Sequence, residues 1–409
     1  MVELLSLLLV GLLLLQALLS GWFALLVRRR LSEPAAAAAW PAAEVVLCLR
    51  GVDPALPATL AALAAQRYGG AWCLLLLVDG ERDPAWQAAS QAIAQLEAAG
   101  AASWRAARLS ALVEPPRSGS RKSAALRQAF AALQPATELV ALVDADAVVR
   151  PEWLAALARG CLRPGVGAAG GNRWYLPARR SGAGMVRAIW NGGALVLMTL
   201  FGIPWGGSLA VRRQLIEPSG WRDVLERSLC EDTALTTPLR RSGRRFRFEP
   251  ELIALDRDDS IALRPLTRWI ARQLLTARLH HPAWPLVALH GLGTSLLLLS
   301  AVLAVLGLVL SGDPAGALRL TLVLLGYELG CGLLLLGIQR VVAAAIPLDQ
   351  RLQLGLWLRW LPLAQLVYGI ATLRAQLARR VEWSGVVYRV VRQGGQRGVE
   401  AVGIESVAS

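Results

Sequence analysis

The chain has 409 residues, of which 55% are hydrophobic and 18% are charged, and its mean hydropathy is +0.46. This composition excludes a disordered, coiled-coil or collagen-like chain and indicates a membrane protein with a soluble part. Lys and Arg number 43 against 29 Asp and Glu, so the formal net charge is +14. That surface suits anionic lipid or nucleic acid. The arginines are spread through membrane-flanking segments, so we expect an anionic membrane surface and no nucleic acid.

The first predicted element is a membrane anchor over residues 1–30. The apolar run from Leu4 to Val27 is long enough to cross a bilayer as one helix. A cleaved signal peptide would carry its positive charge before the run, whereas here Glu3 precedes it and three arginines, Arg28 to Arg30, follow it. Because flanking arginines stay in the cytoplasm, we expect an uncleaved anchor with its N-terminus outside.

Residues 43–260 have the pattern of a soluble α/β domain. Apolar runs predict strands over Val45–Leu49, Leu74–Val78 and Leu139–Val143, and helical stretches between and after them cover Pro57–Gln66, Ala85–Ala98 and Lys122–Leu133. Strands that alternate with helices predict βαβ units and a mainly parallel sheet. Ligands of such sheets bind beyond the carboxyl ends of the strands, so those ends are the places to examine.

The chain after residue 260 returns to the membrane. Residues 261–284 predict a basic amphipathic helix lying in the interface. Apolar segments follow within 285–375, at Leu286–Leu310, Leu318–Ile338 and Leu352–Leu373, and a basic tail covers 376–409. Four spans would place this basic tail outside, against the positive-inside rule. We therefore interpret Leu352–Leu373 as re-entrant or interfacial, with the domain and the tail of this multi-pass protein in the cytoplasm. The five cysteines form no C-x-x-C pair and predict buried thiols.

Two acidic pairs stand out in the α/β domain. Asp144 and Asp146 follow a buried strand two residues apart, and paired carboxylates suit a Mg²⁺ or Mn²⁺ ion that itself holds a diphosphate. Taken alone they fit a solvated strand end equally well. Glu231 and Asp232 come directly before a helix predicted over Thr233–Ser242. They are either ordinary acidic residues at a helix start or a pair that contains a general base.

Two further segments carry polar groups after strands. Asp79 and Asp83 follow the second strand and suit hydrogen bonds to a base or ribose, although an Asp-Gly and Asp-Pro turn explains them nearly as well. Lys122, the only lysine in the chain, stands beside Arg121 at a predicted helix start. Cations there oppose the helix dipole unless an anion is bound, although a solvated helix end is the simpler alternative.

Taken together, these residues resemble the catalytic domain of family 2 inverting glycosyltransferases, most closely the membrane-bound, ceramide-glucosyltransferase-like branch, from Ala43 to His281. The motifs that carry the resemblance are Arg50-Gly-Val-Asp53-Pro, Leu63-Ala-Ala-Gln66-Arg-Tyr68, Asp83-Pro84, Asp144-Ala-Asp146, Gly170 to Pro177, Trp205 to Arg213 and Glu231-Asp232. The closing (Q/R)-x-x-R-W motif of the family is altered here. Arg268-Trp269 is present, Pro265 occupies the first position, and Arg272-Gln273 a turn later is the possible substitute.

The resemblance implies a GT-A fold, a nucleotide-sugar donor, UDP-glucose by default, and inversion at the transferred hexose. It implies Asp144 and Asp146 as metal ligands, Asp232 as general base beside Glu231, and Arg268 and Trp269 as further catalytic residues. It implies donor contacts from Asp53, Asp83, Lys122, Asp144, Gly206 and Gly207. The membrane segments indicate a lipid hydroxyl as acceptor. The alternatives are a polyprenyl-phosphate or short-polysaccharide glycosyltransferase and, more remotely, a non-catalytic membrane scaffold.

Overall fold

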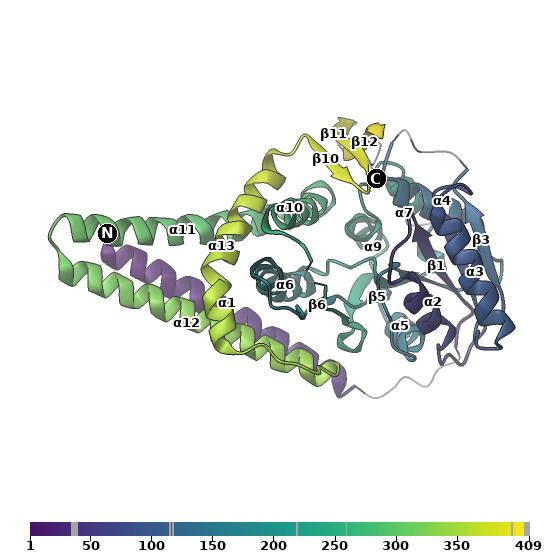
Figure 1. Ribbon diagram of the computed structural model, residues 1–409, viewed down its shortest axis with the longest axis horizontal. Helices are drawn as coiled ribbons and strands as arrows, with labels where there is room; N and C mark the ends of the chain where they lie inside the picture. The colour runs from purple at the N-terminus through teal and green to yellow at the C-terminus, as the bar shows by residue number, and fades with distance from the viewer. Residues whose placement is uncertain are drawn as a thin grey trace.

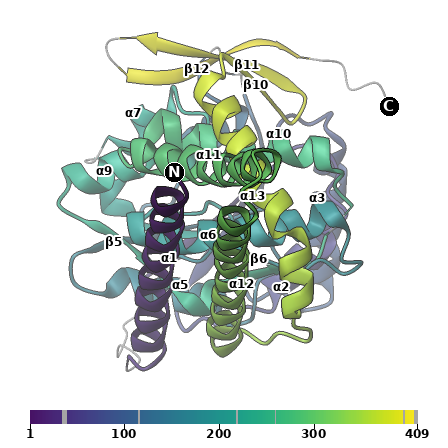
Figure 2. The ribbon, with the colours of Figure 1, turned by 90° about the vertical axis from the view of Figure 1, so that its left-hand side faces the viewer.

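A computed structural model describes residues 1–33, 40–113, 116, 118–217, 220–258, 260–393 and 396–404. An α/β domain forms one end of the molecule, and long apolar helices project from it at the other end (Figure 1). The C-terminal strands lie at the edge of the α/β domain in both Figure 1 and Figure 2. The α/β domain and the long apolar helices therefore lie at different ends of the molecule.

A seven-stranded sheet forms the centre of the α/β domain. Its strands are β1 (Ala43–Leu49), β2 (Trp72–Val78), β3 (Ala107–Ala111), β4 (Leu139–Val143), β5 (Val166–Gly170), β7 (Ser208–Arg212) and β8 (Arg245–Phe248), in the order β3-β2-β1-β4-β7-β5-β8. Only β7 runs antiparallel to its neighbours, β4 and β5. The mainly parallel α/β sheet predicted from the sequence is confirmed. Its parallel register brings the ends of β1, β2 and β4 to one edge.

Helices cover both faces of this sheet. Helices α2 (Leu56–Ala64), α3 (Pro84–Ala98) and α5 (Trp153–Leu162) pack on one face with Leu74 and Leu76, and α4 (Arg121–Ala131), α7 (Trp221–Leu225) and α9 (Thr236–Arg241) pack on the other with Leu75 and Leu77. Alternate side chains of β2 are thus buried on opposite faces of the sheet, which explains why that strand is apolar throughout. The remaining short elements are β6 (Arg173–Tyr175), η1 (Arg213–Leu215), α8 (Glu231–Ala234), η2 (Pro250–Leu252) and β9 (Ala254–Asp256).

Five described helices are long and apolar enough to cross a membrane: α1 (Val2–Leu31), α6 (Gly182–Phe201), α11 (Trp284–Leu310), α12 (Pro314–Ala345) and α13 (Leu354–Leu377). Three of them, α1, α11 and α12, project away from the α/β domain (Figure 1). Helix α6 has no counterpart among the apolar segments expected from the sequence. More than half of the residues in its most apolar stretch are buried inside the protein. Helix α6 therefore packs between the α/β domain and the other long apolar helices.

Helix α13 runs crosswise to α11, close to the α/β domain (Figures 1 and 2). It packs against α10 (Leu263–His280), α11 and α6. After it the chain forms an antiparallel sheet of β10 (Arg380–Trp383), β11 (Val386–Gln393) and β12 (Gln396–Ile404). This sheet is bonded to the α/β domain, since Gly119 N–H donates to the Val399 carbonyl. The C-terminal sheet and the α/β domain therefore lie at the same end of the long apolar helices.

Candidate active site

The acidic residues that follow β1, β2 and β4 line one cavity of about 880 Å³. Asp53, Asp79 and Asp144 come from the ends of these three strands, as the parallel sheet predicts. Asp53 accepts the Ala55 N–H at 2.8 Å, which stabilises the turn after β1. Asp79 forms ion pairs with Arg121 and with Arg50. The cavity is thus lined by both signs of charge.

Asp144 and Asp146 share one cationic partner. The Arg173 guanidinium is paired with Asp146 and lies 3.7 Å from Asp144 Oδ2, so both carboxylates face one point. Two carboxylates that a single cation bridges are a suitable donor set for Mg²⁺ or Mn²⁺. The described residues contain no group of three or more His, Cys, Asp or Glu side chains able to hold a metal. Phosphate oxygens and water would therefore supply the other ligands, as is usual for Mg²⁺.

Lys122 connects this acid pair with the second one. Its Nζ lies 2.7 Å from Asp144 Oδ1 and 2.7 Å from Glu231 Oε1. Burial opposes the charge on Lys122, but the two carboxylates outweigh burial and hold its pKa well above the ordinary value. Burial likewise favours the neutral Asp144 carboxyl, yet Lys122 and Arg173 outweigh it and lower the pKa of Asp144. For Glu231, only 2% exposed, burial prevails over Lys122 and raises the pKa.

Replacing Lys122 should destabilise the fold, and more so at high pH. In Lys122→Met the buried Glu231 carboxylate loses its partner, which costs about 3–5 kcal/mol when the group stays charged. A carboxyl whose pKa is raised by folding loses stability as pH rises above its unfolded pKa. We therefore expect a larger drop in melting temperature at about pH 8 than at about pH 5. Adding Glu231→Gln should restore much of the loss, and equal loss at both pH values would contradict this account.

Asp232 lies where two cavities meet. Its Oδ2 accepts the Gly206 N–H at 3.0 Å and its Oδ1 accepts the Thr233 N–H at 2.6 Å. Among the described residues it is the one acidic side chain that lines both the cavity of the strand ends and a second, apolar cavity. The carboxylate is therefore held by backbone donors and remains accessible from two directions.

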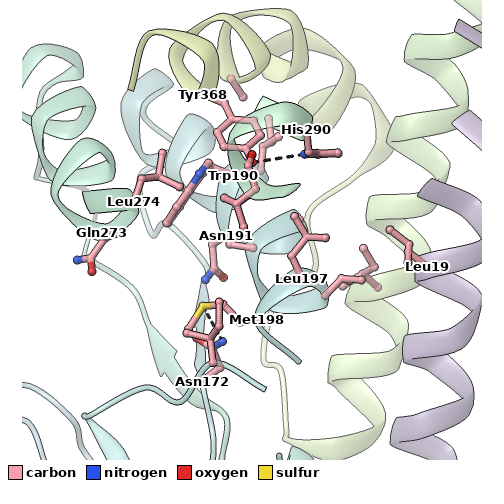
Figure 3. A pocket seen from close by; sticks show the side chains of 18 of the residues that line it. Leu19, Asn172, Trp190, Asn191, Leu197, Met198, Gln273, Leu274, His290 and Tyr368 are labelled. Atoms are coloured by element: carbon pink, nitrogen blue, oxygen red, sulfur yellow. Dashed lines mark hydrogen bonds between the residues drawn. The ribbon is translucent and has the colours of Figure 1, made fainter. Parts of the chain in front are cut away.

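The second cavity has a volume of about 270 Å³ and reaches between the long apolar helices. Its lining comes from α1, α6, α10, α11, α12 and α13 and is mainly apolar. In Figure 3, Trp190, Asn191 and Leu197 of α6 lie between Leu274 of α10 and Leu19 of α1. A cavity of this kind fits the hydrocarbon part of a ligand and opens at Asp232.

Trp269 stands at the junction of the two cavities. Its ring packs edge-on against Tyr175, at 5.9 Å between centroids, and against Trp190, at 5.6 Å. Gln273, one turn later on α10, also lines both cavities. Trp269 thus lines both cavities, and its catalytic role stays a prediction.

Arg268 does not line either cavity, in contrast to its expected place in the site. Its side chain is exposed, whereas Arg272 of the same helix lines the polar cavity. Residues 269, 272, 273 and 276 share one face of α10, and each step along a helix turns the side chain by about 100°, so Arg268 lies beyond the edge of that face. The structure therefore favours Arg272, which the altered family motif left as the substitute.

Two other expected donor contacts are also placed differently. Asp83 lies outside the cavity lining, because its carboxylate accepts the Gly51 N–H at 2.9 Å and caps α3 through Ala85 N–H. It fixes the turn after β1, and Asp79 is the residue of that segment that faces the cavity. Gly207 likewise lies behind the lining, where an added Cβ would stand 2.5 Å from Asp144 Oδ2.

Gly206 lines the polar cavity and cannot hold a side chain. An added Cβ would lie 2.0 Å from Glu231 Oε1, so Gly206→Ala must displace the buried carboxylate. We expect a melting temperature lowered by several degrees and little turnover of any donor. Gly80→Ala is the matched control, because no atom lies within 4 Å of its added Cβ. Equal behaviour of the two variants would contradict the packing argument.

Arg173 lines the polar cavity, although it was not selected from the sequence as a site residue. Arg173 joins Asp144, Asp146 and Asp256, and its guanidinium lies over the Trp205 ring at 4.9 Å. Arg173 lies within the Gly170 to Pro177 motif, but the motif does not indicate which carboxylates pair with Arg173. The contacts join segments far apart in the chain.

Comparison with known proteins relates the chain to a family. The profile described as "Glycosyl transferase family 21" matches residues 8–396. No curated protein sequence matches the chain. A solved structure of the mannosyltransferase PcManGT from Pyrobaculum calidifontis, in complex with GDP-Man and Mn²⁺, is 16% identical, with 91% of this chain and 99% of that chain covered and a TM-score of 0.48. Glucosyl-3-phosphoglycerate synthase from Mycobacterium tuberculosis, with Mn²⁺, UDP-Glc and phosphoglyceric acid, is 17% identical, with 61% and 80% covered and a TM-score of 0.35.

Proposed function

The chain belongs to glycosyltransferase family 21, and we propose that it transfers a hexose from a nucleotide-sugar donor to a hydroxyl group of a membrane lipid, with inversion. The ceramide-glucosyltransferase-like resemblance found in the sequence is confirmed at the level of this family, which carries the number 21 rather than 2. The observation that carries the proposal is the position of Asp232 between a charged cavity and an apolar one.

The charged cavity suits the nucleoside diphosphate of the donor. Lys122, Arg173 and Arg272 place cations around Asp144 and Asp146. The phosphates would therefore be attracted by these cations and by a metal ion held on the two carboxylates. Asp144 and Asp146 would hold Mg²⁺ or Mn²⁺, which when bound neutralises charge on the leaving diphosphate. Binding this metal requires Arg173 to give up its present position between the two carboxylates.

The apolar cavity suits the chains of a lipid acceptor, with its hydroxyl group at Asp232. That carboxylate would remove the hydroxyl proton as the oxygen attacks the anomeric carbon of the donor sugar. The attack comes from the face opposite the leaving diphosphate, so a single displacement inverts this carbon. UDP-glucose remains the default donor from the family resemblance.

The arrangement also supports the topology inferred from the sequence. With α1, α11 and α12 crossing the bilayer and α13 lying at its surface, an N-terminus outside places the α/β domain and the tail in the cytoplasm, next to Arg28 to Arg30. In intact cells, a cysteine-reactive label that cannot cross the membrane should reach Glu3→Cys and not Arg389→Cys. Labelling of the second variant would contradict this topology.

The proposed activity is tested with the full chain purified in detergent. UDP- and GDP-linked hexoses are supplied with Mn²⁺ and a total lipid extract, and the released nucleoside diphosphate and new glycolipids are measured. We expect release that depends on both metal and lipid, with sugar recovered in the organic phase. Sugar found only in water-soluble or polyprenyl-phosphate products would favour the alternative glycosyltransferases, and no release with any donor would overturn the proposal.

A further inference from the structure

The C-terminal sheet forms part of the wall of the charged cavity. Trp383, Ser384 and Tyr388 line it together with the strand-end acids, and Tyr388 is only 2% exposed. Strands β10 and β11 are joined by Ser384 and Gly385, whose φ values are 49° and 70°. Positive φ at both positions is the conformation of tight two-residue hairpin turns. This turn holds Trp383 at the cavity.

Hydrogen bonds attach this sheet to the segments that carry the site. Gly119 N–H donates to the Val399 carbonyl at 2.8 Å, and Val399 N–H donates to the Arg227 carbonyl at 2.9 Å. Arg121 N–H donates to the Tyr388 hydroxyl at 3.3 Å. The segment of Gly119 leads into Lys122, and the segment of Arg227 leads into Glu231 and Asp232. The sheet is therefore fixed relative to the residues that face the donor.

Trp383 makes a specific contact with the unpaired cation of the cavity. The Arg272 guanidinium lies over its ring, 5.1 Å from the centroid, and forms no hydrogen bond or ion pair with any residue that the structure describes. Its N–H donors are thus available to a ligand. A long arginine side chain loses about 2 kcal/mol of rotamer freedom when it is fixed, and an aromatic surface that orients it beforehand reduces what the ligand must offset.

We propose that Trp383 is a positioning residue that holds Arg272 toward the diphosphate of the donor, so that the C-terminal sheet completes the nucleotide-sugar site. This inference rests on the proposed function in one respect, namely that the charged cavity binds a nucleoside diphosphate. The ring orients the guanidinium, and the Ser-Gly turn orients the ring.

The test uses the full chain in detergent, with UDP and GDP in the presence of Mn²⁺ as probes. Replacing the ring in Trp383→Leu should weaken binding of the better probe by about 3- to 30-fold, the range of a cation–π contact. Trp383→Phe keeps an aromatic face and should lose less. In turnover, the KM for the donor should rise and the KM for the lipid should not change. Arg389→Gln is the matched control, since Arg389 belongs to the same sheet, on β11, and its exposed side chain lies outside the cavity.

A double-mutant cycle separates positioning from general support of the fold. In the Arg272→Leu background, Trp383→Leu should have no further effect on nucleotide binding, because its partner is gone. If Trp383→Leu does not fold, Trp383→Phe takes its place in the cycle. Additive losses, or equal binding by wild type and the Trp383 variants, would overturn the inference. Failure of the wild type to bind either probe would instead overturn the proposed function.

Discussion

Asp232→Asn is expected to lower kcat by about 10²–10⁴-fold, the usual contribution of a general base. The asparagine side-chain oxygen can still accept the Gly206 N–H that Asp232 accepts at 3.0 Å, and only the local bond from the Thr233 N–H is lost, so the fold should persist. Nucleotide binding should change little, because Asp232 makes no ion pair with the described cations of the charged cavity. The measurement is turnover with saturating donor and lipid, beside UDP and GDP binding with Mn²⁺.

The matched control is Asp223→Asn, the same chemical change at an exposed position of α7 outside both cavities. It should behave as the wild type in turnover and in melting temperature. Full activity of Asp232→Asn would contradict the role of Asp232 as base. Loss of nucleotide binding together with loss of turnover would assign Asp232 to the donor side instead.

Asp144→Asn should remove metal-dependent donor binding. Neutralising the leaving diphosphate is worth several kcal/mol, so loss of this ligand should reduce kcat/KM by about a thousandfold. Lys122 keeps its ion pair with Glu231 in this variant, and the protein should stay folded. The measurement is binding of UDP and GDP as a function of Mn²⁺ concentration.

Asp223→Asn again serves as control and should show the metal dependence of the wild type. Asp146→Asn should weaken binding less than Asp144→Asn, because the Asp146 side chain is 43% exposed against 24% for Asp144 and a more solvated carboxylate interacts less strongly. Metal-dependent binding that survives in Asp144→Asn would show that this carboxylate does not hold the ion.

The parts of the structure that sequence predicted well depend on short-range patterns. The apolar runs of β1, β2 and β4 have the length of buried strands, and their parallel order follows from the helices between them. Because parallel strands end at one edge, the cluster of Asp53, Asp79 and Asp144 follows from that pattern as well.

The parts that sequence missed depend on rotation and on contacts between distant segments. Arg268 and Arg272 are both arginines of one amphipathic helix, and which of them faces the site depends on how α10 is rotated against α6 and α13. Asp83 was selected by its motif, but its carboxylate is occupied by the turn and the helix cap. Helix α6 has modest hydropathy because it faces both protein and apolar surroundings.

The most direct test of the account compares the lipids of one host that expresses the wild type with those of the same host expressing Asp232→Asn, by mass spectrometry. The account predicts a glycolipid found only with the wild type, with a mass that identifies the hexose and the lipid that received it. Donor hydrolysis in membranes from both strains shows whether the host supplies the acceptor. The same lipids in both strains, with no donor consumed by wild-type membranes, would contradict the assignment of this chain as a lipid glycosyltransferase.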